Sequence, residues 1–152
     1  MFKYKRRINF YDCDPAGILF YGRVYLICHE AYEMMLESFN LKENFWTNDK
    51  FLVPIIHSEA KYRKPLLAGE TAEIEITVTI LKDSSFELTY LIKNDKNEIT
   101  NNVRTVHVFL NKKDWKKTKI DENVKEKLEA HFVELWISKD ECWSNYLRSK
   151  YE

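Results

Sequence analysis

Residues 11–33 read YDCDPAGILFYGRVYLICHEAYE, an acidic turn that runs directly into an apolar, helix-like segment. Two acids, Asp12 and Asp14, stand one residue apart, and Pro-Ala-Gly follows at residues 15–17. Over residues 22–39 apolar side chains then return every three or four positions, which is the period of a helix with one broad apolar side; they are Val24, Cys28, Ala31, Met35 and Phe39. The stretch therefore predicts a long helix over residues 22–39, preceded by a turn that carries a carboxylate.

Strand-like alternation flanks this helix on both sides. The predicted strands cover residues 2–10, 54–65, 72–80, 85–93 and 99–110. In the first, Phe10 is expected on the apolar face, and in the third, Ile80 continues the apolar row that begins at Ala72. One long helix beside a run of antiparallel strands predicts an α+β fold in which the helix lies against one face of the sheet.

The C-terminal third returns to a helical pattern. Val124, Leu128, Phe132 and Leu135 fall on one side, and a capping box at Ser138 and Glu141 predicts a further helix. There is no repeat and no glycine- or proline-rich linker. We therefore expect one domain, with residues 1–114 forming its main body and residues 115–152 a helical extension of it.

The composition excludes several classes of protein. Lysine plus arginine and aspartate plus glutamate both number 24, so the net charge is zero, which argues against a nucleic-acid-binding protein. No apolar run reaches the length of a membrane span or a signal peptide. The three cysteines form no paired motif. We expect a protein of the cytoplasm with no metal and no cofactor.

Two interpretations of Asp14 are open from the residues alone. An aspartate before proline is common turn chemistry, and it often caps a helix. Alternatively, Gly17 permits an unusual backbone angle that aims the carboxylate towards the free N–H groups at the helix start. A base or nucleophile beside a site that stabilises a developing oxyanion is what acyl transfer requires. Asp12, at the end of a strand, is the weaker candidate.

Other chemically active residues have ordinary structural roles in this interpretation. His29 and Glu33 are spaced for a contact within one helix rather than for zinc, because a second histidine is missing. The acids beside Cys13 should raise the pKa of its thiol. His57 and His107 lie within strand patterns and are expected to be hydrogen-bonded core or edge residues. Basic residues at strand ends, Arg63, Lys64 and Lys82, would meet either solvent or phosphate groups.

The segment DCDPAGILFYGRVYL resembles the signature of the 4-hydroxybenzoyl-CoA thioesterase family, Asp-x-Asp-x-x-Gly-hydrophobic-hydrophobic-Tyr, and the likeness extends over residues 3–111. The resemblance implies a hot-dog fold, acyl-CoA thioester hydrolysis and a homodimer or homotetramer. It implies that Asp14 is the catalytic carboxylate and that the backbone N–H of Tyr21 polarises the thioester carbonyl. Many relatives carry histidine where Gly22 stands here, so no role transfers for that residue.

The resemblance also implies where the two halves of the substrate bind. Lys82 and Ser84 fall where the family contacts coenzyme A, and we add Arg63 and Lys64 to that set. The segments ICHEAYE and PIIHSEA are similar to the branch that hydrolyses 1,4-dihydroxy-2-naphthoyl-CoA. From the aromatic and partly polar residues near the helix start and on the strand opposite, we expect an aromatic acyl group bound by Tyr25, His57 and Glu59, with His57 as the partner of a ring hydroxyl.

Three alternatives remain at this point. The protein could act on acyl-carrier-protein thioesters or on short and medium straight-chain acyl-CoAs. A dehydratase of the same fold is disfavoured, because no histidine follows Asp14 before His29. The protein could also be a catalytically silent module that binds acyl-CoA.

Overall fold

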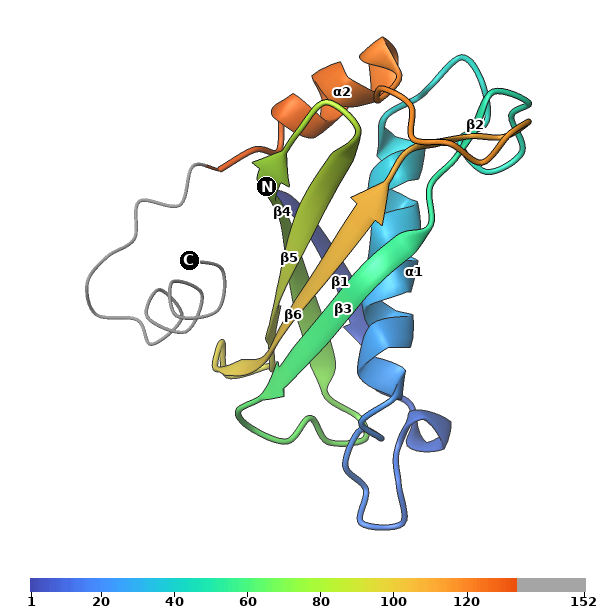
Figure 1. Ribbon diagram of the computed structural model, residues 1–152. Coiled ribbons are helices and arrows are strands. Elements are labelled where there is room, and N and C mark those ends of the chain that lie inside the picture. Colours follow the sequence, from blue (N-terminus) through green and yellow to red (C-terminus); the bar gives the residue numbers. More distant parts are fainter. Residues whose placement is uncertain (134–152) are drawn as a thin grey trace, which may run out of the picture.

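A computed structural model describes residues 1–133 of the chain. Its elements follow in the order β1 (Phe2–Arg7), the 3₁₀ turn η1 (Phe10–Asp12), α1 (Arg23–Ser38), β2 (Phe51–Leu52), β3 (Ile55–Tyr62), β4 (Thr71–Leu81), β5 (Ser85–Lys93), β6 (Ile99–Val108), β7 (Leu110–Asn111) and α2 (Glu122–Glu129). Figure 1 shows a curved sheet with α1 lying along it. The predicted C-terminal capping box and Leu135 lie outside the described residues.

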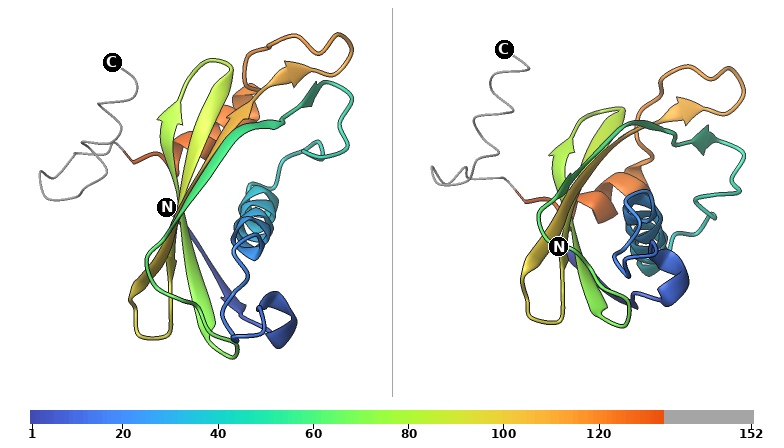
Figure 2. Two further views of the ribbon diagram at one scale, coloured as in Figure 1. Left: turned by 60° about the horizontal axis from the view of Figure 1, so that its bottom comes forward. Right: turned by 90° about the horizontal axis from the view of Figure 1, so that it is seen from below.

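Five strands form the main sheet in the order β1-β4-β5-β6-β3, and every neighbouring pair is antiparallel. The sheet twists and curves so that one face wraps α1, which is clear when the molecule is viewed along the helix (Figure 2). Strands β2 and β7 form a separate two-stranded ribbon. The predicted α+β architecture, with one long helix against a sheet face, is confirmed.

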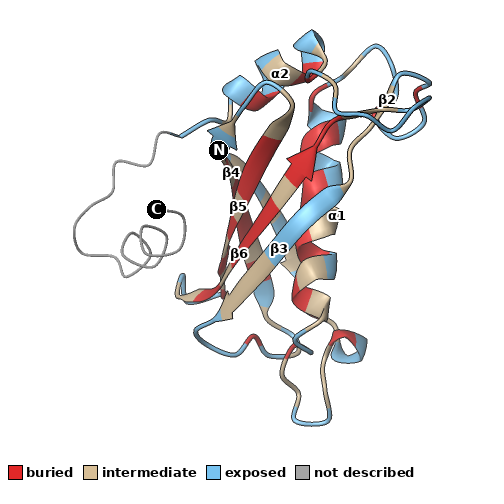
Figure 3. Ribbon diagram, in the orientation of Figure 1, coloured by how far each residue is buried: buried red, intermediate tan, exposed pale blue. Residues whose placement is uncertain are grey.

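The core lies between α1 and the inner face of the sheet. Figure 3 shows that the buried residues concentrate along α1, β5 and β6, whereas the first half of β3 is exposed. The residues of α1 that are buried include those expected from the sequence: Val24, Ile27, Cys28, Ala31, Tyr32, Met35 and Leu36. Each of the larger side chains, such as Val24, Ile27, Met35 and Leu36, contributes roughly 1.5–3 kcal/mol through its removal from water, so the helix–sheet contact is a major source of the fold's stability.

The sequence pattern was wrong about the side chains at two strand ends. Phe10 lies in η1 and is 80% exposed, because β1 ends at Arg7. Ile80 is 42% exposed, because the pairing register of β4 with β5 shifts between Val78 and Ile80. A bulge of one residue sends the following side chain to the opposite face of the sheet.

The C-terminal segment packs into the same core as the sheet. Asp121 caps α2 by accepting hydrogen bonds from the N–H groups of Asn123 and Val124. Val124 and Leu128 are buried, as the helical spacing predicted. Phe132 lies beyond the end of α2 and pairs with Val78 through a short parallel bridge, so it does not continue the helical stripe.

A polar network ties β1 to the acidic turn and to α1. The Arg6 guanidinium donates to both carboxylate oxygens of Asp12, with N···O distances of 3.0 and 3.2 Å. Asp12 also accepts the N–H of Asn9, and its side chain is only 2% exposed. Arg6 and the Tyr4 hydroxyl both contact Glu30 of α1. Asp12 is therefore a structural anchor of the turn, which agrees with its lower rank as a candidate catalyst.

Candidate active site

The segment from Asp12 to Phe20 folds back on itself in front of α1. Cys13 pairs with Leu19 in an antiparallel bridge, and the Asp14 N–H donates to the Ile18 carbonyl at 2.9 Å. At the tip, Gly17 has φ of +75° and donates its N–H to the Asp14 carbonyl. A residue with a Cβ adopts this backbone conformation only at a cost. The role expected for Gly17, to form the turn, follows from this geometry.

The Asp14 carboxylate is half-buried, and only one of its oxygens is occupied. Oδ1 accepts hydrogen bonds from the N–H of Ala16 at 2.9 Å and from that of Ile18 at 3.4 Å. Within residues 1–133 no hydrogen bond or ion pair reaches Oδ2. The turn thus fixes the orientation of the carboxylate through one oxygen and leaves the other oxygen available for chemistry.

The N-terminus of α1 follows this turn directly. Gly22 occupies the N-cap position and supplies no capping side chain. The N–H groups of Tyr21 and Gly22 donate to no acceptor in the described chain. The Tyr62 hydroxyl of β3 donates to the Tyr21 carbonyl at 2.9 Å and fixes the backbone there. Free N–H groups at a helix N-terminus stabilise negative charge on an oxygen placed near them.

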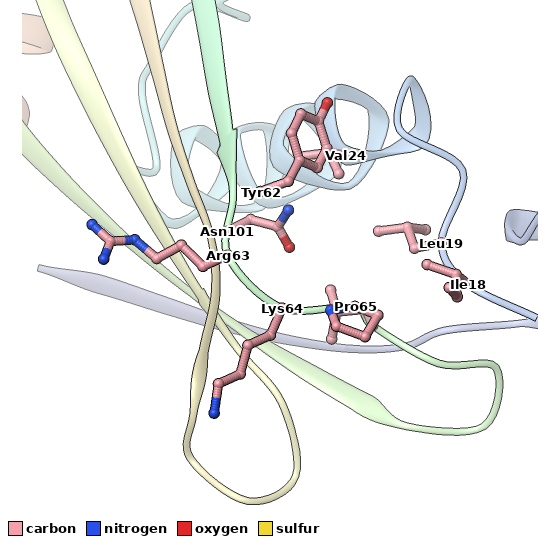
Figure 4. A pocket seen from close by; sticks show the side chains of 9 residues that line it. Ile18, Leu19, Val24, Tyr62, Arg63, Lys64, Pro65 and Asn101 are labelled. Carbon is pink, nitrogen blue, oxygen red and sulfur yellow. The ribbon is translucent and has the colours of Figure 1, made fainter.

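A first cavity, of about 230 Å³, lies beside this helix start. It is lined by the turn, by the beginning of α1 and by the end of β3: Ile18, Leu19, Val24, Tyr62, Arg63, Lys64, Pro65, Leu66 and Asn101. Figure 4 shows the Tyr62 ring directed towards α1, while the Arg63 and Lys64 side chains extend away from Ile18 and Leu19. Arg63 Nε donates to Asn102 at 2.8 Å, and Lys64 pairs with Glu98 at 2.6 Å. The apolar cavity thus has a basic outer rim.

A second cavity, of about 320 Å³, extends from the same helix start between α1 and the sheet. Its helical wall is the stripe Gly22, Tyr25, Leu26 and His29, together with Cys28. Its sheet wall is Ile55 and Ser58 of β3, Tyr90 of β5 and Thr105 of β6. Tyr25 therefore lies where the sequence prediction put it, on the wall of a cavity beside the helix start.

The structure does not bring His57 and Glu59 to either cavity. They alternate with Ser58, so their side chains lie on the outer face of the sheet, away from α1. There His57 Nε2 is 3.3 Å from Glu59 Oε2, and Glu59 pairs with Arg104, which in turn contacts Glu87. The expected edge position of His57 holds, but Ser58 is the β3 side chain that faces the cavity.

The four residues expected to bind coenzyme A are divided between the two ends of the sheet. Arg63 and Lys64 follow β3, at the end where the acidic turn lies. Lys82 and Ser84 form the turn between β4 and β5, at the opposite end near α2 (Figure 1). One chain therefore does not gather all four around one site.

Two smaller predictions, on His29 and on Cys13, are confirmed by the structure. His29 Nε2 lies 3.3 Å from Glu33 Oε1 within α1, as its spacing indicated. Burial raises the pKa of the Cys13 thiol, and the charges of Asp12 and Asp14 raise it further. In the described part of the chain no three histidine, cysteine or acidic side chains are grouped as metal ligands would be. None of the helices described is long and apolar enough to cross a membrane.

The sequence alone did not identify the polar side chains on the sheet side of the second cavity, Tyr90 and Thr105, or the contact of Thr105 with His107. Tyr90, Thr105 and His107 all point to the inner face of the sheet, and His107 is fully buried beside a stacked Phe86 ring. His107 was correctly expected to be a core residue with a hydrogen bond, which Thr105 provides at 2.8 Å. The sequence did contain evidence for this placement: the three polar residues occupy the same alternate positions of their strands as the inward-facing apolar residues of β5 and β6.

Burial of His107 makes stability depend on pH. Burial lowers its pKa from 6.5 to about 3, and the nearby His29 adds to this effect. Between these values the unfolded chain binds a proton that the native chain does not, so stability falls as the pH falls below about 6.5. We expect His107→Gln to reduce the slope of unfolding free energy against pH, to which His107 adds at most about 1.4 kcal/mol per pH unit. Urea unfolding between about pH 7 and pH 5 measures this slope, and an unchanged slope in the variant would contradict the prediction.

The chain matches a family profile, that of the thioesterase-like superfamily, over residues 8–128. Among curated proteins, a 1,4-dihydroxy-2-naphthoyl-CoA hydrolase from Gloeothece citriformis is 37% identical over 115 residues, which cover 73% of this chain and 80% of the relative.

Two solved structures are similar over most of the chain. A 1,4-dihydroxy-2-naphthoyl-CoA thioesterase from Synechocystis superposes with a TM-score of 0.78 at 25% identity, covering 84% of this chain and 94% of the other. A gentisyl-coenzyme A thioesterase superposes with a TM-score of 0.73, also at 25% identity, covering 83% and 98%. The family profile spans the acidic turn, α1 and strands β2 to β7.

Proposed function

This chain belongs to the thioesterase-like superfamily, and we propose that it hydrolyses the thioester of an aromatic acyl-CoA to the free acid and coenzyme A. The hot-dog fold expected from the resemblance is confirmed by the solved relatives. The observation that carries the proposed reaction is the placement of one unoccupied carboxylate oxygen, Asp14 Oδ2, on a turn that leads directly into the free N–H groups of Tyr21 and Gly22.

In the proposed mechanism, the thioester carbonyl oxygen accepts a hydrogen bond from the Tyr21 N–H at the start of α1. Asp14 then either removes a proton from a water molecule that attacks the carbonyl carbon, or attacks that carbon itself. Negative charge develops on the carbonyl oxygen, where the helix N-terminus stabilises it. The C–S bond breaks as the tetrahedral intermediate collapses, and the leaving thiolate takes a proton, from Asp14 in the first route and from water in the second. In the second route a water molecule then hydrolyses the acyl–Asp14 anhydride, which releases the free acid and restores the carboxylate.

The aromatic acyl group is proposed from two independent lines of support. The similar proteins named above act on dihydroxynaphthoyl and gentisyl thioesters, which are both hydroxylated aromatic acyl groups. The second cavity has the volume of a small-molecule site and is lined by Tyr25, His29 and Tyr90. Aromatic walls of this kind suit a flat ring.

Arg63 and Lys64 are proposed to attract the phosphates of coenzyme A. Both side chains lie at the outer rim of the first cavity, where the pantetheine arm would pass towards the helix start. Lys82 and Ser84 of the same chain are at the far end of the sheet. We propose that they reach the site from a second subunit.

A homodimer that pairs through β3 would account for the distance of Lys82 and Ser84 from Arg63 and Lys64 within one chain. β3 is an edge strand, and its large apolar or aromatic side chains Ile55, Ile56 and Tyr62 are 43%, 61% and 51% exposed. An uncovered apolar edge strand is a liability that proteins usually pair or cover. Antiparallel pairing of two β3 strands about a twofold axis puts the β4–β5 turn of one subunit beside the acidic turn of the other. Two such dimers would form the alternative tetramer.

We place the protein in the cytoplasm. Cys28 is buried as a free thiol and Cys13 is a half-buried one, which is usual in a reducing compartment.

The proposed reaction is tested by the release of free thiol from aromatic acyl-CoAs. We expect stoichiometric release of coenzyme A and free acid from hydroxybenzoyl- and dihydroxynaphthoyl-CoA, followed with a thiol-specific reagent and chromatography of the acid. If no thiol were released from these or from straight-chain acyl-CoAs, the chain would be a binding module without catalytic activity.

A further inference from the structure

Four polar side chains lie together where α1 meets β5 and β6. They are Tyr32, Tyr90, Thr105 and His107, and each is at most 4% exposed. The buried residues around these four are mostly apolar, so the cluster is a group of polar side chains enclosed by the hydrophobic core. Burying such groups costs free energy unless they are hydrogen-bonded.

The cluster has more hydrogen-bond donors than it has hydrogen-bond contacts within the described chain. Thr105 Oγ1 lies 2.8 Å from His107 Nε2 and 3.4 Å from the Tyr90 hydroxyl. The Tyr32 hydroxyl and His107 Nδ1 have no partner in the described chain. Three hydroxyls and one neutral imidazole bring four donor protons, but residues 1–133 provide only these two contacts. At least two protons therefore lack an acceptor.

The cluster opens onto the second cavity through two of its members. Tyr90 and Thr105 line the cavity wall, and Gly22 lies at the helix-start end of the same cavity. Where Thr105 donates to Tyr90, the phenolic proton of Tyr90 has no acceptor within the described chain. A ligand whose thioester sits at the helix start would extend along the cavity towards this unused donor.

The charge of the cavity restricts what such a ligand can be. Among the described residues, the lining contains no lysine, arginine, aspartate or glutamate, and its histidine, His29, already contacts Glu33. Behind the wall, the low pKa of His107, caused by burial, keeps that imidazole neutral at physiological pH. A carboxylate or ammonium group would lose its hydration there without gaining a lysine, arginine or acidic partner. A neutral hydroxyl group, which both accepts and donates, fits the available partners.

We propose that Tyr90, held by Thr105, is the specificity residue that recognises a ring hydroxyl of the aromatic acyl group. This inference rests on the proposed thioesterase function and assigns the substrate's polar substituent to a named side chain. A site built to hydrogen-bond a substrate hydroxyl rejects an analogue that lacks it more strongly than an apolar pocket rejects a missing methylene.

The test is a cycle of two substrates and two enzymes. The substrates are 1,4-dihydroxy-2-naphthoyl-CoA and 2-naphthoyl-CoA, which share the ring and differ in the hydroxyls. Tyr90→Phe removes one oxygen and preserves the volume of the side chain. We expect kcat/KM for the hydroxylated substrate to fall about tenfold in the variant, the value of one hydrogen bond of about 1.4 kcal/mol, while that for naphthoyl-CoA changes less than about twofold. Comparing ratios cancels the intrinsic reactivity of the two thioesters.

Three further variants sharpen the result. Thr105→Val should reduce the same ratio and Thr105→Ser should restore it, because the hydroxyl of residue 105 donates to Tyr90 and positions it. Tyr4→Phe, on the same face of the sheet but on edge strand β1, should leave the ratio unchanged. An equal effect of Tyr90→Phe on both substrates, or no effect, would overturn the inference while the thioesterase function stands. Absence of thiol release from either substrate by the wild-type protein would overturn both.

Discussion

Asp14→Asn lowers turnover by at least about a hundredfold, the lower end of what a general acid–base group contributes. The expectation follows because the two carboxylate oxygens differ: Oδ1 holds the turn, and Oδ2 is available to the substrate. An amide keeps the oxygen that accepts the Ala16 N–H, so the turn should retain its shape. It replaces Oδ2 with an NH₂ group, which is neither a base nor a nucleophile. Steady-state thiol release with an aromatic acyl-CoA measures the loss.

Two controls separate lost chemistry from lost structure. Binding of coenzyme A by Asp14→Asn, measured by calorimetry, should match the wild type, because the phosphates are proposed to meet Arg63 and Lys64. Asp12→Asn should reduce turnover much less, although it breaks the bidentate contact with Arg6 and should lower the unfolding free energy by about 2 kcal/mol. Equal activity of the two variants, or a greater loss of turnover for Asp12→Asn, would mean that Asp14 is not the catalytic carboxylate.

Ile56→Asp is expected to give a monomer with turnover as low as that of Asp14→Asn. Ile56 is 61% exposed on edge strand β3, so the substitution does little to the fold of one chain. At the proposed seam the substitution buries a carboxylate against the partner's β3, and burying a charged group costs free energy. The monomer would then lack Lys82 and Ser84 of its partner.

Light scattering coupled to size exclusion, followed by an assay of each fraction, measures this effect. Ile80→Asp is the matched control, because Ile80 is 42% exposed on β4, which has neighbours on both sides in the sheet. That variant should keep the wild-type mass and activity. A fully active Ile56→Asp monomer would show that one chain contains a complete site.

The sequence predicted the helix, the strands and the acidic turn because each rests on local information. The three- and four-residue spacing within α1 and the Pro-Ala-Gly of the turn are readable in any single chain. The side-chain directions of Ile80 and His57 were not predictable in this way. A one-residue bulge in β4 reverses the direction of Ile80, and a register shift between Ile55 and His57 in β3 has to be known before Ser58 can be placed facing α1.

The binding residues show the same limit on a larger scale. Tyr90 lies on β5, and Thr105 and His107 lie on β6, the other strand of the same hairpin. The exact register of that hairpin, which decides which of these side chains meet, is not visible in the sequence. Lys82 lies far from Arg63 within one chain, because β4 carries the backbone the full length of the sheet between them. A residue-by-residue comparison with a family assigns Arg63, Lys64, Lys82 and Ser84 to one coenzyme A site. Only the tertiary and quaternary structure decides which of them lie close together.

The most direct test of the central claim is a comparison of kcat/KM for dihydroxynaphthoyl-, hydroxybenzoyl-, hexanoyl- and lauroyl-CoA with the wild-type protein. The proposed function predicts that a hydroxylated aromatic substrate exceeds both straight chains by at least about tenfold, or about 1.4 kcal/mol of transition-state discrimination. A straight chain that exceeded both aromatic substrates by the same factor would contradict it.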